Sequence, residues 1–390
     1  MAKVKDIAMQ IRGVSYHPED LYDNLDEDSV VLLRANNIKD GKLILDDVVY
    51  VSKSKVAEQQ YLQTGDILIC ASSGSKELVG KAAFVDSVKN PMTFGAFCKV
   101  VRPQPEYSEY LGHYFNSPVY RRKISALSAG ANINNIKNEH IDNLDIQLVD
   151  EKERREIITI LNELNMLISL RKQQLAKLDE LVKARFVEMF GDPVANIANW
   201  PIERLEKHLT IIGGYAFKSD GFRAKGIPVL RIGNINSGYF QPTNMVYWHD
   251  DSTLERYKMH PGDLVISLTG TVGKNDYGNV CILGNDYSEY YLNQRNAKLE
   301  LNETLNGIYL SELLKFPQIK GRLTGISRGI RQANISNKDI LSLPILIPPI
   351  SLQKQFAAFV ERVERQKQTV QQSLEKLELM KKALMQEYFG

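Results

Sequence analysis

Hydrophobic and polar positions follow two different periods along the chain. Residues 1–150 and 201–349 contain short runs rich in β-branched and aromatic side chains, such as LILDDVVYVS and NMVYW, bounded by Gly-Asp and Pro-Gly turns. Residues 151–190 and 350–390 instead carry apolar side chains at alternating steps of four and three, the spacing of a helical seam. The pattern predicts two globular α/β (α+β) domains, each followed by a long helix, with a linker at residues 191–200.

The second half of the sequence is a copy of the first. LRANNIKDGKL from Leu33 aligns with LRIGNINSGYF from Leu230, an offset of 197 residues, and the two Gly-Asp turns keep this offset. Beyond the loop after each turn the offset becomes 199, as Asn135 and Asn334 show, and it stays so to the end of the chain. Registration over such a length predicts a tandem duplication, not a solenoid of short repeats.

The two helical seams complement each other. The first comprises Ile157, Leu161, Leu164, Ile168, Arg171, Leu175, Leu178, Val182, Arg185 and Met189, and the second Phe356, Val360, Val363, Lys367, Val370, Leu374, Leu377, Lys381, Leu384 and Tyr388. Where one seam is charged, the aligned position of the other is apolar, whereas a self-paired helix would stack like charges. We therefore predict that the helices pack on each other as an antiparallel coiled coil with a domain at each end. The seam alone favours a structural brace, whereas two similar domains held apart by a rigid rod suit a ligand that has two similar sites.

Composition and charge narrow the class of protein. The 390 residues are 43% hydrophobic and 25% charged, as in globular proteins, and the formal charge of +2 means that local basic patches must meet any polyanion. No apolar run approaches the ~20 residues of a membrane span. The first residues, MAKVKDIAMQ, lack the apolar core of a signal peptide. With only three cysteines, all far apart, the sequence predicts a cytoplasmic protein without membrane contact.

Motifs of catalytic and cofactor sites are missing from the sequence. TGTVGK, at 269–274, departs from the phosphate-loop pattern, and the six histidines lack the spacing of metal ligands. The sequence contains neither a nucleophile elbow nor a methyltransferase cofactor loop. Asp66 and Asp263 are interpreted as turn residues, not as catalytic acids. We expect a chain that is not an enzyme and that binds no cofactor or metal.

Polar loops at equivalent places in both copies form the candidate binding site. One loop follows the Gly-Asp strand and the other precedes the last strand, and their residue types contact phosphates and base edges. The same residue types also simply favour loops, so composition leaves both interpretations open. The candidate DNA-binding residues are Ser73, Gly74, Ser75, Lys76, Asn132, Asn134, Asn135, Thr269, Gly270, Thr271, Lys274, Arg328, Arg331, Gln332 and Asn334. Nearby basic charge comes from Arg121, Arg122, Lys123, Lys320 and Arg322.

Taken together, these motifs resemble a known family. Two copies of an L-R-x-x-N-I…G-D-[IL] stretch, a polar N-I-x-[NK] loop and a long helix ending in ARFVEMFGDP are similar to the specificity subunit of Type I restriction-modification systems. The resemblance covers essentially the whole chain. It implies two target-recognition domains, each reading one half of a bipartite, asymmetric sequence in double-stranded DNA, with the helices setting the distance between the half-sites.

The resemblance also implies partner proteins. Methyltransferase subunits, two of them, would dock on the helices, and restriction/translocase subunits would join to cleave unmethylated DNA. One departure is that the first domain begins almost at Met1, so its entry strand is expected to be shorter than the strand before Gly213-Gly214. Two alternatives stay open: a structural coiled-coil adaptor that binds protein partners, and a self-contained DNA methyltransferase or nuclease, against which the missing motifs weigh.

Overall fold

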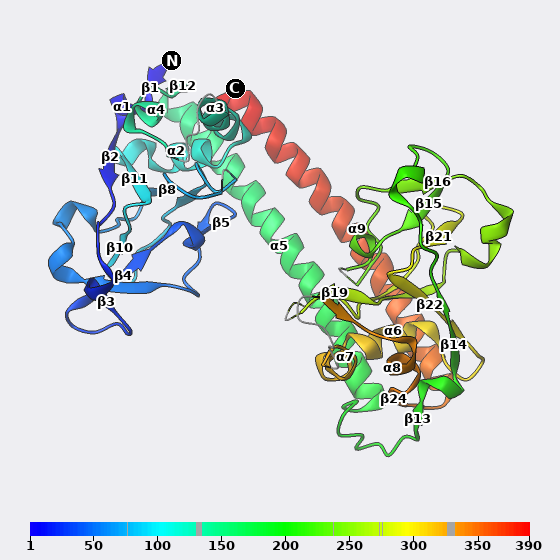
Figure 1. The fold of residues 1–390 in the computed structure, drawn as a ribbon. Coiled ribbons are helices and arrows are strands. Elements are labelled where there is room, and N and C mark those ends of the chain that lie inside the picture. The colour runs from blue at the N-terminus through cyan, green and yellow to red at the C-terminus, as the bar shows by residue number, and fades with distance from the viewer. Residues whose placement is uncertain (76, 130–134, 237, 273, 275, 326–331) are drawn as a thin grey trace. The chain divides into compact units, whose positions relative to one another are not determined.

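A computed structural model describes the chain except for residues 76, 130–134, 237, 273, 275 and 326–331. The chain forms two compact units, one of residues 1–173 with 371–390 and the other of residues 174–370 (Figure 1). Each of the two 40-residue helices is shared between the units, because α5 (Glu151–Phe190) begins in the first and ends in the second, whereas α9 (Ile350–Phe389) does the reverse. Both chain termini therefore belong to the first unit.

The described part of the first unit contains two four-stranded sheets. The antiparallel sheet has the order β2 (Ala8–Arg12), β11 (Cys98–Pro103), β8 (Ile67–Cys70) and β9 (Ala82–Phe84). The other has the order β10 (Met92–Phe94), β4 (Ser29–Leu33), β7 (Val49–Ser52) and β3 (Leu21–Tyr22), with β10 parallel to β4. Two-stranded pairs are β1 (Ala2–Lys3) with β12 (Asp145–Ile146) and β5 (Ile38–Lys39) with β6 (Lys42–Leu43). The shorter helices are α1 (Val4–Ile7), α2 (Ser108–Phe115), α3 (Pro118–Ala129) and α4 (Asn138–Asp142).

The second unit repeats this plan with different edges. Its antiparallel sheet has the order β14 (Leu209–Gly213), β22 (Asn296–Leu301), β18 (Leu264–Ser267) and β20 (Val280–Ile282). The other sheet has the order β16 (Val246–Trp248), β15 (Ile227–Leu230), β21 (Tyr290–Leu292) and β17 (Lys258–Met259), with β15 parallel to β21. The pairs are β13 (Ile202–Arg204) with β24 (Pro344–Leu346) and β19 (Thr269–Thr271) with β23 (Gln332–Asn334). The shorter helices are α6 (Gly307–Lys315), α7 (Pro317–Thr324) and α8 (Asn337–Leu341).

The strand registers show where the two copies diverge. Ile67 pairs with Phe84 in the first unit and Leu264 with Ile282 in the second, so the offset rises from 197 to 198 between these strands. The offset reaches 199 only at the helices α2 and α6, which begin at Ser108 and Gly307. The two extra residues of the second copy are therefore inserted at two separate places. The entry strands β2 and β14 both contain five residues, each paired along its whole length. The expectation of a shorter first entry strand was therefore wrong.

Helices α5 and α9 pack antiparallel, as the seams predicted. In the first unit, Arg171 near the middle of α5 donates a hydrogen bond from Nε to the Ser373 hydroxyl of α9 at 3.2 Å. In the second unit, Lys367 of α9 forms an ion pair with Asp179 of α5 at 2.7 Å. The mixed sheets and the paired helices confirm the predicted fold class.

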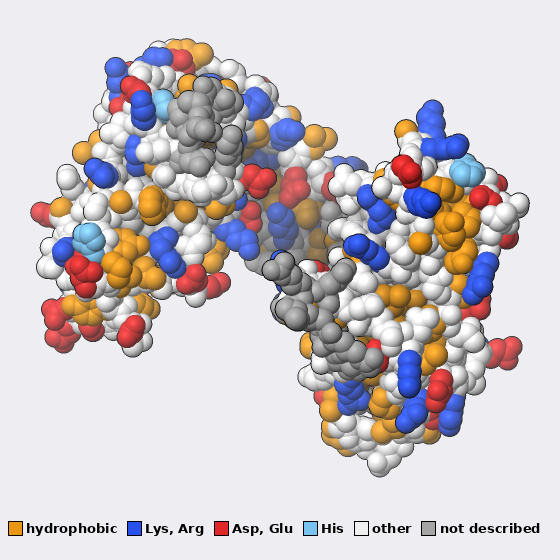
Figure 2. Space-filling view, in the orientation of Figure 1, with side chains coloured by type: hydrophobic (Ala, Val, Ile, Leu, Met, Phe, Trp, Pro, Cys, Tyr) orange, Lys and Arg blue, Asp and Glu red, His pale blue; other side chains and the backbone are white. Residues whose placement is uncertain are grey.

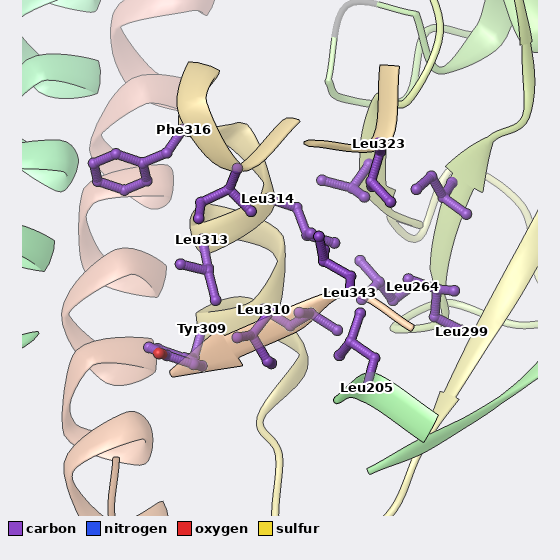
Figure 3. Packing of buried hydrophobic residues seen from close by; sticks show 14 of the residues in the cluster. Leu205, Leu264, Leu299, Tyr309, Leu310, Leu313, Leu314, Phe316, Leu323 and Leu343 are labelled. Carbon is purple, nitrogen blue, oxygen red and sulfur yellow. The ribbon is translucent and has the colours of Figure 1, made fainter. Parts of the chain in front are cut away.

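Each unit is completed by the ends of both long helices. The core of the first unit includes Ile157 and Leu161 from the start of α5 and Met385 and Phe389 from the end of α9. In the core of the second unit, shown in Figure 3, Leu310 and Leu314 of α6 lie near the strand residues Leu264 and Leu299, while Tyr309 and Phe316 lie on the side of the long helices. The buried residues from the long helices there are Val182, Phe186, Phe190, Phe356, Val360 and Val363.

Candidate nucleic-acid interface

The Gly-Asp turn has a structural role in both units. Its glycine has a positive φ, 95° in the first unit and 92° in the second, a conformation that glycine adopts without strain. The carboxylates of Asp66 and Asp263 each accept a hydrogen bond from the backbone amide three residues earlier, at 2.8 Å in both cases. Asp66 also forms two hydrogen bonds of 2.8 Å with Arg102, and Asp263 pairs with Lys298 at 3.0 Å. The interpretation of both aspartates as turn residues is thus confirmed.

The two polar loops of each unit lie next to each other. In the first unit, the amide of Ile136 donates a hydrogen bond to the carbonyl of Ala71 at 2.7 Å, and Ser72 forms a β-bridge with Asn135. In the second unit, the amide of Ile335 donates to the carbonyl of Leu268 at 2.8 Å. There the contact extends into the antiparallel pair β19 and β23. In each copy, the same backbone hydrogen bond therefore joins two loops that are more than sixty residues apart in the sequence.

The structure places part of the predicted DNA-binding set at these loops. Exposed residues are Gly74, Ser75, Asn135, Thr271, Lys274 and Asn334, and partly buried ones are Ser73, Thr269 and Gly270. Gln332 takes part through its backbone, as the β-partner of Thr271. Lys76, Asn132, Asn134, Arg328 and Arg331 lie outside the described residues. Thr271 is also held locally, because Asp276 accepts hydrogen bonds from its amide at 2.8 Å and from its hydroxyl at 3.0 Å.

Some of the basic residues that precede the later polar loop of each unit form hydrogen bonds inside that unit. Arg121 donates from Nη1 to the carbonyl of Val79 at 2.8 Å, and Lys320 donates from Nζ to Oδ1 of Asn279 at 2.6 Å, so each holds the far end of its loop. Burial lowers the pKa of Lys320. On the face shown in Figure 2, Lys and Arg side chains are interspersed with Asp and Glu in both units. This face of the described residues therefore shows no single basic patch.

The L-R-x-x-N-I stretch contains residues whose role the sequence did not reveal. The buried amide of Asn37 accepts a hydrogen bond from the Arg34 amide at 2.8 Å and donates to two carbonyls further along the chain. Asn234 makes the same set of contacts after Arg231. The Nε atoms of both arginines are buried without a hydrogen-bond partner among the described residues. Both copies have an arginine at this position, so the alignment of the two halves could have marked Arg34 and Arg231 as a shared feature.

The described part of the chain contains no cluster of metal-ligating side chains, and its cysteines form no disulfide. Cys70, Cys98 and Cys281 are free and buried, and burial raises the pKa of Cys70 to about 11 and those of the other two thiols to about 12, which favours the neutral thiol. Among the described residues, no three His, Cys, Asp or Glu side chains cluster closely enough to hold a metal ion. The described helices include none that is both long and apolar enough to span a membrane.

Comparison with known proteins places the duplicated domain in a family. Residues 9–180 and residues 198–379 both match the Type I restriction modification DNA specificity domain. The chain belongs to this family. It is 31% identical over 382 residues to the Type I restriction enzyme EcoKI specificity subunit of Escherichia coli strain K12, covering 94% of this chain and 81% of that protein. It is 29% identical over 390 residues to the StySPI specificity subunit of Salmonella potsdam, covering 93% of this chain and 81% of that one.

The fold of the chain is also similar to that of a solved S-subunit structure. The crystal structure of the Type I restriction-modification S subunit from M. genitalium superimposes with a TM-score of 0.56 and 13% sequence identity, over 100% of this chain and 95% of that one. The specificity-subunit family, with its DNA specificity domain present twice, confirms the prediction made from the repeat. A specificity subunit is the non-catalytic DNA-recognition component of a Type I system, so the expectation that the chain is not itself an enzyme is confirmed by its family.

Proposed function

We propose that the paired loops of each unit contact one half of a bipartite double-stranded DNA target. The observation that carries this proposal is the backbone hydrogen bond from Ile136 to Ala71, which recurs between Ile335 and Leu268. The connection is the same in both copies, whereas the loops that it joins differ in sequence, SSGS in the first copy against TGTV in the second. A duplicated support that carries different polar loops suits two half-sites of different sequence.

We further propose that α5 and α9 set the spacing between the half-sites. At ~1.5 Å per residue, each 40-residue helix is ~60 Å long, and their apolar seams pack against each other. Val370 and Leu374 of α9, which belong to neither globular core, are 7% and 6% exposed, which is the burial expected of a coiled-coil seam. A paired helix resists bending more than a single one, so it can transmit a fixed distance.

Methyltransferase subunits are the proposed partners of the long helices. Outside the seam, α5 and α9 expose large apolar side chains that no other described part of the first unit covers, at Ile160, Met166, Leu167, Leu170, Leu379 and Met380. Apolar groups grouped on a helix that already buries another face are typical of a protein contact. We propose two methyltransferase copies, one for each specificity domain, restriction/translocase subunits that join this assembly, and action in the cytoplasm, where free buried thiols are stable.

The loop proposal is tested by changing one unit at a time. In one variant Ser73 and Ser75 become alanine, in another Thr269, Thr271 and Lys274 do, and each is assembled with the methyltransferase subunits. We expect the methylated motif, read by sequencing, to relax in one half-site for the first variant and in the other half-site for the second. Ser54→Ala, at an exposed serine outside the loops, serves as the control. Two unchanged motifs would overturn the proposal and favour the adaptor alternative.

The formal charge leads to a second test. With a net charge of +2, the isolated chain neutralises few phosphates, so its binding to duplex DNA should be weak and should tighten when methyltransferase subunits are present. Equal affinity with and without those subunits at one salt concentration would contradict a shared DNA interface.

A further inference from the structure

A turn between two strands has the same backbone in both units but entirely different side chains. It is Gly95-Ala96-Phe97 between β10 and β11, and Asn293-Gln294-Arg295 between β21 and β22. In the first turn the carbonyl of residue 95 accepts a hydrogen bond from the amide of Cys98 at 2.8 Å, and in the second that of residue 293 accepts from Asn296 at 2.9 Å. We refer to them as the 95–97 turn and the 293–295 turn.

Each turn supports the loop that the sequence predicted to contact DNA. The carbonyl of Phe97 accepts hydrogen bonds from the amides of Ala71 at 2.9 Å and Ser72 at 3.0 Å. The carbonyl of Arg295 accepts from the amide of Leu268 at 2.9 Å. The third residue of each turn thus lies beside the first residues of the loop, on the same side of its unit.

A close backbone approach keeps the turns in place. A Cβ atom at Gly13 would lie 2.2 Å from the carbonyl oxygen of Gly95, and a Cβ at Gly214 would lie 2.1 Å from that of Asn293. Only glycine fits such a contact, and both copies have it at the equivalent position. The duplication has therefore kept the backbone of the turn while the side chains on it changed.

The side chains of the two turns differ in the chemistry that distinguishes bases. Phe97 is 71% exposed and presents an apolar ring to solvent, whereas the exposed Gln294 and Arg295 carry an amide and a guanidinium. Arginine binds guanine, glutamine binds adenine, and an apolar ring packs against the methyl group of thymine. In the second unit the turn also borders an open cavity of about 510 Å³ that Arg231 and Phe222 help to line.

We infer that the 95–97 and 293–295 turns are specificity-determining elements, in which Arg295 reads a guanine of one half-site and Phe97 contacts a thymine methyl of the other. The inference rests on the proposed function and extends it, because residues that read different half-sites must differ between copies, whereas residues that support them need not. Gly13, Gly214 and the backbone hydrogen bonds belong to the support, and the exposed side chains of the turns belong to the reading surface.

The test uses the chain assembled with its methyltransferase subunits and compares methylation of the cognate site with sites altered at one base pair. For Arg295→Ala, we expect discrimination at one guanine of one half-site to fall about 5- to 150-fold, with the other half-site and the spacer unchanged. Phe97→Ala should reduce discrimination at one thymine of the other half-site, and Phe97→Leu should retain most of it. Both side chains are exposed, so thermal unfolding of the variants should match that of the parent. Arg204→Ala, at an exposed arginine of the same unit in β13, is the matched control.

The possible outcomes separate the two proposals. Unchanged discrimination for Arg295→Ala and Phe97→Ala, with altered motifs for the loop variants, would overturn this inference and leave the proposed function standing. A uniform loss of methylation on every sequence would also overturn it, since it would assign Arg295 to a phosphate. If the loop variants leave the motif unchanged as well, the proposed function itself fails.

Discussion

Phe186 of α5 and Phe356 of α9 pack edge to face in the second unit, with ring centroids 5.4 Å apart and an interplanar angle of 88°. Both rings are fully buried, and Phe186 also lies 5.5 Å from the ring of Tyr309 in α6. One side chain therefore joins the two long helices to the globular part of the unit. The helices that are proposed to set the half-site spacing are therefore anchored in the core of the second unit.

This contact gives the first prediction. Phe186→Ala should lower the free energy of unfolding by about 3–5 kcal/mol, because it removes a large buried ring and leaves a cavity between three helices. The measurement is urea unfolding followed by circular dichroism. Val187→Ala, at the neighbouring residue that is 41% exposed, should change stability by no more than about 0.5 kcal/mol. Equal unfolding midpoints for the two variants would show that the end of α5 is not part of this core.

The same contact shows what helical periodicity could and could not predict. Between Ile157 and Ile168 the seam was identified correctly, because its apolar positions are all buried there. At their C-terminal ends, α5 and α9 also enter a globular core, so the buried face includes Phe186 and Phe190 in one and Met385 and Phe389 in the other, none of which belonged to the predicted seam. The period of one helix cannot reveal a second partner that approaches from another side.

The candidate interface could be described only in part from the sequence, for a similar reason. Loop composition drew attention to the residues after β8 and β18, and internal alignment identified the two copies. The meeting of each loop with a second loop, and its support by the Phe97 or Arg295 carbonyl, depend on strand pairing at long sequence separation. Side chains that differ between the copies, such as Phe97 and Arg295, leave no shared pattern in a single sequence, although they are the ones expected to distinguish bases.

His113 gives a prediction for the first unit at low pH. Its Nε2 lies 3.0 Å from Oδ1 of Asn162 in α5, and Nδ2 of the same asparagine donates a hydrogen bond to the carboxylate of Glu109 in α2 at 2.9 Å. Burial lowers the pKa of His113 to about 4, against 6.5 for the free side chain, an effect that the hydrogen bond to Asn162 opposes and the charge of Lys381 reinforces. The folded state binds the proton of His113 less well than the unfolded state does. The stabilisation of the folded state that comes from neutral His113 is therefore fully present above about pH 6.5 and is lost as the pH falls through about 4.

The expected size of this effect is about 3 kcal/mol between pH 7 and pH 4. Because many carboxylates titrate in the same range, the measurement is the difference between the parent and His113→Gln, each unfolded in urea at several pH values. The stability of the parent should fall more steeply toward pH 4 than that of the variant. Parallel profiles would show that His113 does not couple protonation to unfolding.

Arg231 is predicted to contact a phosphate and not a base. Both copies have arginine at this position, as Arg34 in the first unit, and a residue that is the same for two different half-sites is suited to a feature that they share. Arg231→Ala should weaken DNA binding by the assembled complex about equally on cognate and altered sites, and should reduce the slope of log affinity against log salt by about 1. A salt titration of binding measures both. A loss confined to one base pair would instead assign Arg231 to base reading, alongside Arg295.

The spacing proposal leads to the last prediction, and the ion pair between Lys367 and Asp179 shows where to test it. Leu175 lies one turn before Asp179 on α5, and Val370 about one turn after Lys367 on the antiparallel α9, so both lie at a similar level of the coiled coil. Inserting seven residues after each keeps the apolar seam in register and lengthens the pair by ~10 Å.

At ~3.4 Å per base pair, this lengthening corresponds to about three base pairs. Sequencing the methylated sites should therefore show a spacer about three base pairs longer between two unchanged half-sites. A seven-residue insertion in α5 alone is the control, because it shifts the α5 seam against that of α9 and should impair assembly without defining a new spacer. A matched pair of insertions that leaves the spacer unchanged would show that the helices connect the recognition domains without measuring DNA. A changed half-site with an unchanged spacer would instead mean that the insertion had altered the recognition surface. The distance between the half-sites would then be set by another part of the protein.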